Sequence, residues 1–177
     1  EIPYKKKVLL LNNLLSDYEC QQLIRNSEQV GFLSMEREYP NNIRDNKRLL
    51  VLNDKLAEII YNRISQFLYK YKDLRPFGFN VKGKWKPKSL NKCFRFSKYE
   101  SPSIGFKPHR DALFIENKDN RSIFTILIYL NDDYDKGETN FIEANKKRVA
   151  GEAVNQELSE GYNKIFSYKA TKGSALI

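Results

Sequence analysis

The stretch that decides the fold is residues 123–130, which read IFTILIYL. Successive side chains of a β-strand point to opposite faces, so the even-numbered positions form one wholly apolar face. The odd-numbered positions place Thr125, Leu127 and Tyr129 on the other face, which therefore carries a hydroxyl and a phenol. This pattern predicts a strand with one side in the core and the other lining a pocket with a few polar groups. An ordinary buried strand whose Tyr129 hydroxyl meets a backbone partner has the same pattern.

Two helices are expected before this strand, after an opening strand at residues 7–11. Ser16 followed by Glu19 matches the capping box, and Gly31 is a suitable end for the first helix. A second helix is expected from near Asn53, where apolar residues recur at helical spacing. Its predicted core stripe consists of Leu56, Ile59, Ile60, Ile64, Phe67, Leu68 and Tyr71.

Short strands are expected to follow the helices. They are predicted at residues 90–99, 123–130, 137–141, 165–168 and 175–177, with a turn at Lys172-Gly173 and a long loop at 143–161. Helices followed by many short strands indicate an α+β protein in which the helices buttress a β-sandwich or barrel.

Composition narrows the class of protein. The chain has 177 residues, 41% hydrophobic and 13% aromatic, enough for one domain with a sizeable core. No apolar run approaches the ~20 residues of a membrane span and no signal peptide is visible, so we expect a cytoplasmic protein, with the endoplasmic reticulum as the alternative. Two cysteines, Cys20 and Cys93, are too few for a disulfide framework or a four-ligand zinc site. The single histidine, His109, excludes the paired-histidine zincin motif.

The net charge of +9 favours encounters with nucleic acids or acidic peptides, although scattered lysines mostly serve solubility. Residues 82–88 interleave Lys82, Lys84, Lys86 and Lys88 around Trp85. An extended backbone would place the four lysines on one side. Such a row suits an acidic peptide or single-stranded nucleic acid, and it also suits the protection of a strand edge.

The candidate chemistry lies in residues 106–111, FKPHRD. Residues i and i+2 of an extended backbone share a face, so His109 and Asp111 would present an imidazole nitrogen and a carboxylate oxygen together. These are two of the three ligands of a 2-His-1-carboxylate facial triad, which binds Fe(II). Taken alone, the spacing also fits a surface pair in which Asp111 orients His109 or pairs with Arg110.

Several ordered segments resemble a known family. They are LLSDYEC at 14–20, NKR at 46–48, FRFSKY at 94–99, FKPHRD at 106–111, TILIYLNDD at 125–133, GETNF at 137–141 and KGSALI at 172–177. Together they are similar to the Fe(II)- and 2-oxoglutarate-dependent dioxygenases, in their prolyl 4-hydroxylase-like branch. The resemblance covers nearly the whole chain.

The resemblance implies a distorted double-stranded β-helix, or jelly roll, with the N-terminal helices packed outside. His109 and Asp111 would be iron ligands, and the hydroxyls of Tyr99 and Tyr129 would contact 2-oxoglutarate. Leu127 and Thr139 are expected to line the same pocket. The implied reaction couples the oxidative decarboxylation of 2-oxoglutarate to hydroxylation of a substrate C–H, with ascorbate as an accessory reductant. The expected substrate is a peptidyl residue such as proline.

The family's second iron histidine, and the basic residue that pairs with the far 2-oxoglutarate carboxylate, lie beyond the last matching segment. We therefore expect residues 1–177 to be a single dioxygenase-like domain truncated at its C-terminal end. A histidine should follow within about a dozen residues of Ile177, and an Arg or Lys should follow on the next strand. Substrate loops are expected at residues 33–45, 76–89 and 143–161.

Two alternatives stay open. One is a catalytically inactive domain of the same fold that binds an acidic protein or a nucleic acid through its basic surface. The other is an oxygenase that acts on nucleic acid. Iron-dependent turnover of 2-oxoglutarate separates the enzymes from the inactive domain.

Overall fold

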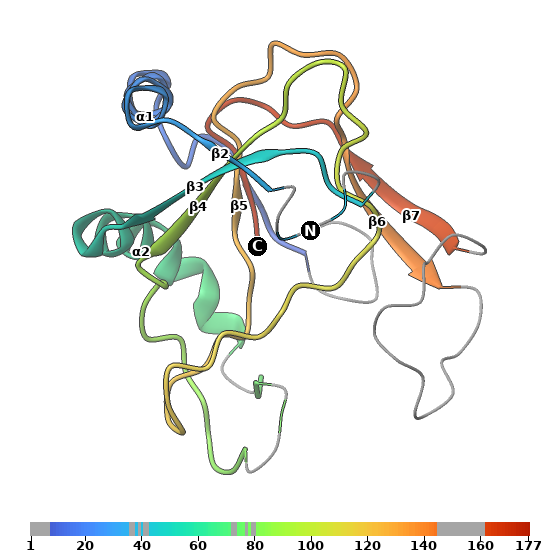
Figure 1. The fold of residues 1–177 in the computed structure, drawn as a ribbon. Helices are drawn as coiled ribbons and strands as arrows, with labels where there is room; N and C mark the ends of the chain where they lie inside the picture. The colour runs from blue at the N-terminus through green and yellow to red at the C-terminus, as the bar shows by residue number, and fades with distance from the viewer. Residues whose placement is uncertain are drawn as a thin grey trace.

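The computed structural model describes residues 8–35, 38, 40, 43–71, 74–76, 78, 81–144 and 162–177. Their elements, in chain order, are β1 (Leu10–Leu11), α1 (Asp17–Val30), β2 (Leu33–Ser34), β3 (Lys47–Leu52), α2 (Asp54–Leu68), the 3-10 turn η1 (Tyr69–Tyr71), β4 (Cys93–Lys98), β5 (Leu127–Ile128), β6 (Thr139–Ala144), β7 (Tyr162–Tyr168) and β8 (Ala175–Leu176). This mixture of helices and antiparallel strands confirms the α+β class (Figure 1).

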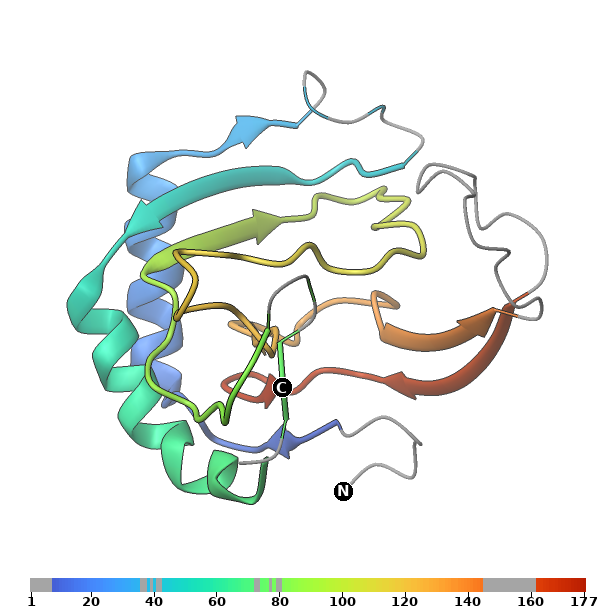
Figure 2. The ribbon, with the colours of Figure 1, turned by 90° about the horizontal axis from the view of Figure 1, so that it is seen from below.

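The strands form three antiparallel groups, with orders β1-β8-β5, β2-β3-β4 and β6-β7. β3 and β4 pair along their whole length, from Lys47 opposite Lys98 to Leu52 opposite Cys93. Figure 2 shows both helices along one side of the strands, which run away from them toward the β6-β7 pair. The helices therefore buttress the sheets from one side, as the element order predicts.

The first helix begins and ends as its sequence predicts. The Ser16 hydroxyl accepts from the Glu19 amide at 3.2 Å, and the Glu19 carboxylate accepts from the Ser16 amide at 2.8 Å. At the other end Gly31 has a φ of 91°, a left-handed conformation that favours glycine, and its N–H donates to the Ser27 carbonyl. The capping box and the glycine stop are both confirmed.

The second helix also starts at the predicted place, with the Asn53 side chain accepting from the Leu56 amide at 2.9 Å. Its buried residues are Ala57, Ile60, Ile64 and Leu68. The predicted stripe is wrong for Ile59 and Phe67, which are 38% and 41% exposed. Each directly precedes a buried residue, and one position on a helix turns a side chain by about 100° away from the core-facing line.

The alternation predicted for residues 123–130 is confirmed. Phe124, Ile126 and Ile128 pack against the main core cluster, which gathers residues of β1, α2, η1 and β8. On the other face Thr125 and Leu127 are exposed, and Tyr129 packs in a second cluster with Val8, Tyr168, Ala170 and Leu176. Only Leu127–Ile128 enter the ladder as β5, so the pattern predicted the two faces better than the length of the strand.

Several predicted boundaries are wrong. Residues 33–34 and 47–52 form β2 and β3, although 33–45 was expected to be a loop and no strand was predicted at 47–52. β6 runs on to Ala144, past the predicted loop start at 143, and β7 begins at Tyr162 rather than 165. Residues 145–161 of that loop lie outside the described residues. Mutual pairing lengthens both strands of a hairpin, which a single-strand pattern does not reveal.

Among the described residues, no helix combines the length and apolar character needed to cross a membrane.

Candidate metal centre

His109 and Asp111 lie together, with His109 Nε2 3.4 Å from Asp111 Oδ1. The other ring nitrogen, Nδ1, lies 2.8 Å from the Lys107 carbonyl oxygen. A carbonyl only accepts hydrogen bonds, so Nδ1 carries the proton and the neutral ring keeps its lone pair on Nε2. That lone pair and the carboxylate oxygen then face each other, an arrangement that needs a proton or a cation between them. The donor atoms fit the imidazole and carboxylate ligands of a divalent metal.

The electrostatics of the pair follow from this geometry. When His109 is protonated, its Nε2–H donates to the Asp111 carboxylate, and this hydrogen bond raises the pKa of His109 above its ordinary value, against the opposing effect of partial burial. The same bond lowers the pKa of Asp111, and a further hydrogen bond from the Thr125 side chain adds to the effect. Asp111 is thereby held as an ionised, oriented carboxylate, which is the state that a metal ligand requires.

The imidazole of His109 stacks on the Phe106 ring, which the Arg44 guanidinium also contacts. The Phe106 ring stacks on His109 with centroids 3.6 Å apart and planes 22° from parallel. The Arg44 guanidinium lies 4.2 Å over the Phe106 ring centroid. Arg44 and Phe106 also form an isolated antiparallel β-bridge, beside the hydrogen bond from the Lys107 amide to the Ile43 carbonyl at 3.0 Å. The loop that carries His109 is thus fastened to the segment leading into β3.

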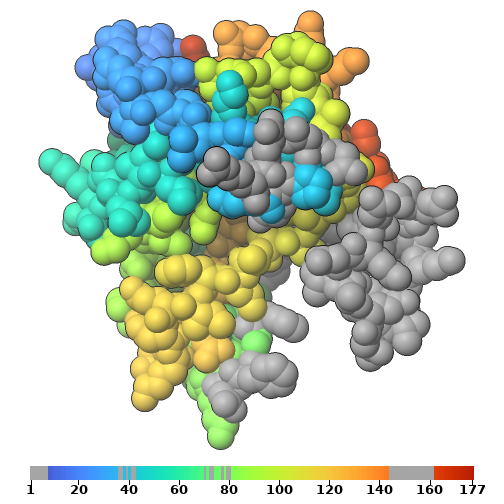
Figure 3. All heavy atoms as spheres, viewed as in Figure 1, coloured from blue at the N-terminus to red at the C-terminus, as the bar shows by residue number. Residues whose placement is uncertain are grey.

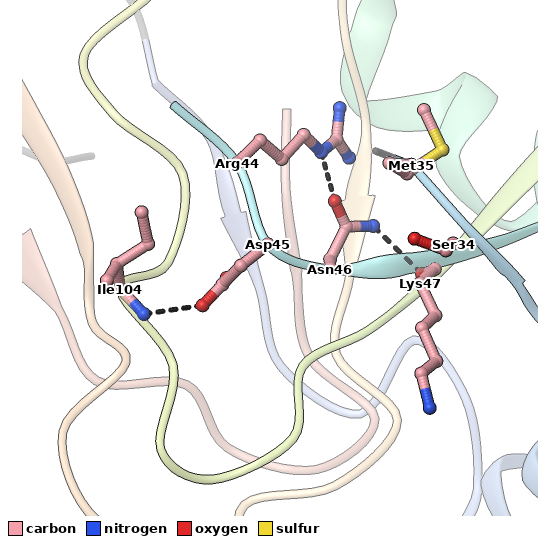
Figure 4. Close-up of a pocket in the computed structure, with 7 residues that line it drawn as sticks. All are labelled: Ser34, Met35, Arg44, Asp45, Asn46, Lys47 and Ile104. Carbon is pink, nitrogen blue, oxygen red and sulfur yellow. Dashed lines mark hydrogen bonds between the residues drawn. The ribbon is translucent and has the colours of Figure 1, made fainter. Parts of the chain in front are cut away.

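Arg44 links this loop to the predicted co-substrate residue Tyr99. Its side chain hydrogen-bonds Ser97 Oγ at 3.3 Å and the Tyr99 hydroxyl, and its Nε donates to the Asn46 side chain (Figure 4). Although Tyr99 is 45% exposed, desolvation raises the pKa of its hydroxyl, against the lowering effect of Arg44. Tyr99 and His109 therefore share Arg44 as a neighbour.

The other predicted co-substrate residues form a second group. The Tyr129 hydroxyl lies 2.6 Å from Thr139 Oγ1, and burial raises the pKa of Tyr129 to about 12. Its ring packs beside Tyr168, with centroids 5.7 Å apart. Leu127, two residues earlier, is 44% exposed. The structure thus brings Tyr129 and Thr139 together, with Leu127 on the same strand face.

A single strand face connects the two groups. Thr125 contacts Asp111 and Tyr129 contacts Thr139, and these positions are four residues apart on one side of the strand. Four residues of extended chain span about 13 Å. Neither of two cavities, one of about 320 Å³ beside Arg44 (Figure 4) and one of about 430 Å³ beside Phe67, is lined by Tyr129 or His109. Asp111 meets this strand face through Thr125, and Leu127 and Tyr129 lie on it, whereas Tyr99 lies beside Arg44; neither of the two cavities joins the two groups.

Arg44 and Thr125 are absent from the predicted site residues, and Phe106 carries no predicted role although it lies in the recognised motif. The sequence does point to Thr125, because the alternation of a strand places it on the same face as Leu127 and Tyr129. No feature of the sequence points to Arg44, since it lies 65 residues from His109 and comes close to it only in the folded chain. Among the residues that the structure describes, no group of three or more His, Cys, Asp or Glu side chains could hold a metal.

Comparisons of the chain with protein-family models, with curated proteins and with solved structures find no match.

Proposed function

We propose that the chain belongs to an Fe(II)- and 2-oxoglutarate-dependent dioxygenase that hydroxylates a C–H bond of a peptidyl residue such as proline. The observation that carries the proposal is the His109–Asp111 pair, whose two donor atoms face each other across 3.4 Å. The sequence motifs around this pair supply the reaction class and the peptide substrate. Iron bound there would supply the oxidative chemistry.

His109 and Asp111 would hold the metal in this proposal. The Lys107 carbonyl fixes the His109 tautomer and Thr125 fixes the Asp111 carboxylate, so both ligands are oriented in advance. The chain has no second histidine, and the proposal therefore requires a third ligand from outside the 177 residues.

Tyr129 and Thr139 would bind the co-substrate. Both carry hydroxyls that can donate to a carboxylate, and the Tyr129 phenol, whose pKa burial raises to about 12, keeps its proton well above neutral pH. Tyr99 would bind from the other side, next to Arg44. The exposed Leu127, on the same strand face as Tyr129, would offer an apolar wall for the carbon chain of 2-oxoglutarate.

The proposal includes the jelly-roll fold that the family has. In its support, the β5-β8 pairing encloses the β6-β7 pairing in sequence, so residues 127–176 form a nested antiparallel hairpin. Such nested antiparallel pairing is how jelly rolls are built.

Succinate formation tests this function. The protein that carries this chain is incubated with Fe(II), 2-oxoglutarate and proline-containing peptides, and we expect iron-dependent succinate. Asp111→Ala should abolish it, whereas Asp119→Ala, which removes an exposed carboxylate eight residues further along the chain, should leave it intact. An inactive domain of the same fold would form no succinate with any peptide and would bind its partner equally well without iron.

A further inference from the structure

Residues 81–92 carry five lysines and no acidic side chain. Burial alternates along 84–88: Lys84, Lys86 and Lys88 are exposed, while Trp85 and Pro87 between them are half-buried. Proline disfavours helical backbone in the residue before it, which keeps Lys86 extended. The three lysines therefore form one exposed row. Lys82 is separated from this row by a bend at Gly83, where φ is 80°.

The usual structural explanation does not apply to this row. Lysines often protect the exposed edge of a sheet, but this segment belongs to none of the sheets formed by the described residues. Lys92, at the end of the segment, pairs with a carboxylate, as do Lys47 and Lys98 on the sheet. In the described part of the chain, no carboxylate lies within ion-pair distance of the three row lysines.

The row is held in place against a hairpin that exposes an aromatic ring. Lys88 Nζ donates to Asn120 Oδ1 at 3.3 Å, and the Trp85 indole N–H donates to the Lys82 carbonyl at 3.1 Å. The hairpin that carries Asn120 is closed between Phe114 and Ser122. Phe114 is 43% exposed. Both segments extend below the sheets in Figure 1 and contribute to the lower lobe of Figure 3.

We propose that this basic lobe, formed by Lys84, Lys86, Lys88, Trp85 and Phe114, binds single-stranded nucleic acid. The lysines would contact successive phosphates, and the exposed Phe114 ring would stack on a base. An acidic peptide would use the lysines but has no use for the aromatic ring. The proposal does not depend on iron or on the dioxygenase assignment.

Binding is measured with a fluorescent oligothymidylate of about 15 nucleotides, which is close to the longest site that one domain occupies on a single strand. We expect a rise in anisotropy that weakens with salt. Replacing Lys84, Lys86 and Lys88 by alanine should flatten the log–log salt slope by about 2, since each phosphate contact contributes about 0.7. The matched control replaces Lys55, Lys164 and Lys169, three exposed lysines from other parts of the chain, and should leave the slope nearly unchanged.

Two further readouts separate a specific site from general charge attraction. Trp85 is the only tryptophan, so its intrinsic fluorescence should change on binding to unlabelled oligothymidylate. Phe114→Ala should weaken binding about tenfold, and Phe114→Tyr should retain it, because the stacking ring remains. Equal losses in the two triple variants would overturn the proposal. So would polyglutamate that competes as well as the oligonucleotide, or an unchanged Trp85 signal.

Discussion

At the scale of single residues, the tautomer of His109 determines what the site can do. The His109 Nδ1–H donates to the Lys107 carbonyl, which leaves Nε2 to face Asp111. Both side chains are substantially exposed, at 40% and 52%, so they contribute little to packing. The pair is therefore better suited to binding a ligand than to stabilising the fold.

Asp111→Ala should accordingly remove metal binding while changing the free energy of unfolding by less than about 1 kcal/mol. Isothermal titration with Fe(II) under anaerobic conditions, together with urea unfolding, measures both quantities. An Asp111→Ala protein that kept wild-type iron affinity would show that this carboxylate is not a ligand.

Tyr129→Phe tests the co-substrate contact. A hydrogen bond to a charged group contributes about 1.5–3 kcal/mol, so the 2-oxoglutarate KM should rise at least tenfold. Tyr162→Phe on β7, where the tyrosine is 42% exposed, serves as the control. An unchanged KM would indicate that the Tyr129 hydroxyl serves Thr139 alone.

At the scale of elements, the turn before β8 fastens the start of α1 to the β5 segment. The Gly173 amide donates to the Tyr129 carbonyl at 2.8 Å, and its own carbonyl accepts from the Leu15 amide at 3.1 Å. Its φ is 77°, and an added Cβ would overlap the Leu15 carbonyl oxygen. The overlapping oxygen belongs to the backbone, and the Leu15 amide is itself bonded to Gly173, so this segment cannot move aside without breaking that contact.

Gly173→Ala should therefore destabilise the protein by about 3 kcal/mol or more, from the left-handed backbone and the steric overlap together. Gly105→Ala is the control, because its φ of 76° is similar but no atom lies within 4 Å of its added Cβ. That variant should lose only about 1 kcal/mol. Urea unfolding compares them, and equal losses would refute the close approach at Gly173.

The two helices are joined by a charged contact. Arg63 of α2 makes a bidentate pair with Glu19 of α1, at 2.6 and 3.0 Å, and also donates to the Leu14 carbonyl. The Arg63 hydrogen bonds, followed by the Ser16 amide, lower the pKa of Glu19 to about 2 from 4.5. A lowered folded-state pKa gives stability that is present above pH 4.5 and is lost as the pH falls toward 2.

Between pH 4.5 and pH 2 the free energy of unfolding of the wild type should fall by about 1 kcal/mol more than that of Glu19→Gln. The expected difference is small because both side chains of the pair are about one-third exposed, and solvent screens their interaction. The glutamine keeps an oxygen for the Ser16 amide but does not titrate, so the difference between the two pH profiles reports the titration of Glu19. Unfolding curves at several pH values measure the difference. Parallel pH profiles for the two proteins would mean that the pair adds no stability.

At the scale of the whole molecule, the features that sequence could predict are local ones. The capping box at Ser16, the Asn53 start and the two faces of residues 123–130 depend on neighbours within a few residues. β3 could not be predicted in this way, because KRLLVL has no alternation and becomes a strand by pairing with β4. The same holds for Arg44, whose contact with Phe106 exists only once β3 and the His109 loop are side by side.

The central claim, that His109 and Asp111 bind iron, is tested most directly by locating the metal. Fe(II) bound to the protein, treated with ascorbate and hydrogen peroxide, cleaves nearby backbone, and mass spectrometry maps the cuts. We expect cuts clustered within a few residues of positions 109–111, lost in Asp111→Ala and retained in Asp119→Ala. Cuts concentrated elsewhere, or an unchanged pattern in Asp111→Ala, would contradict the claim.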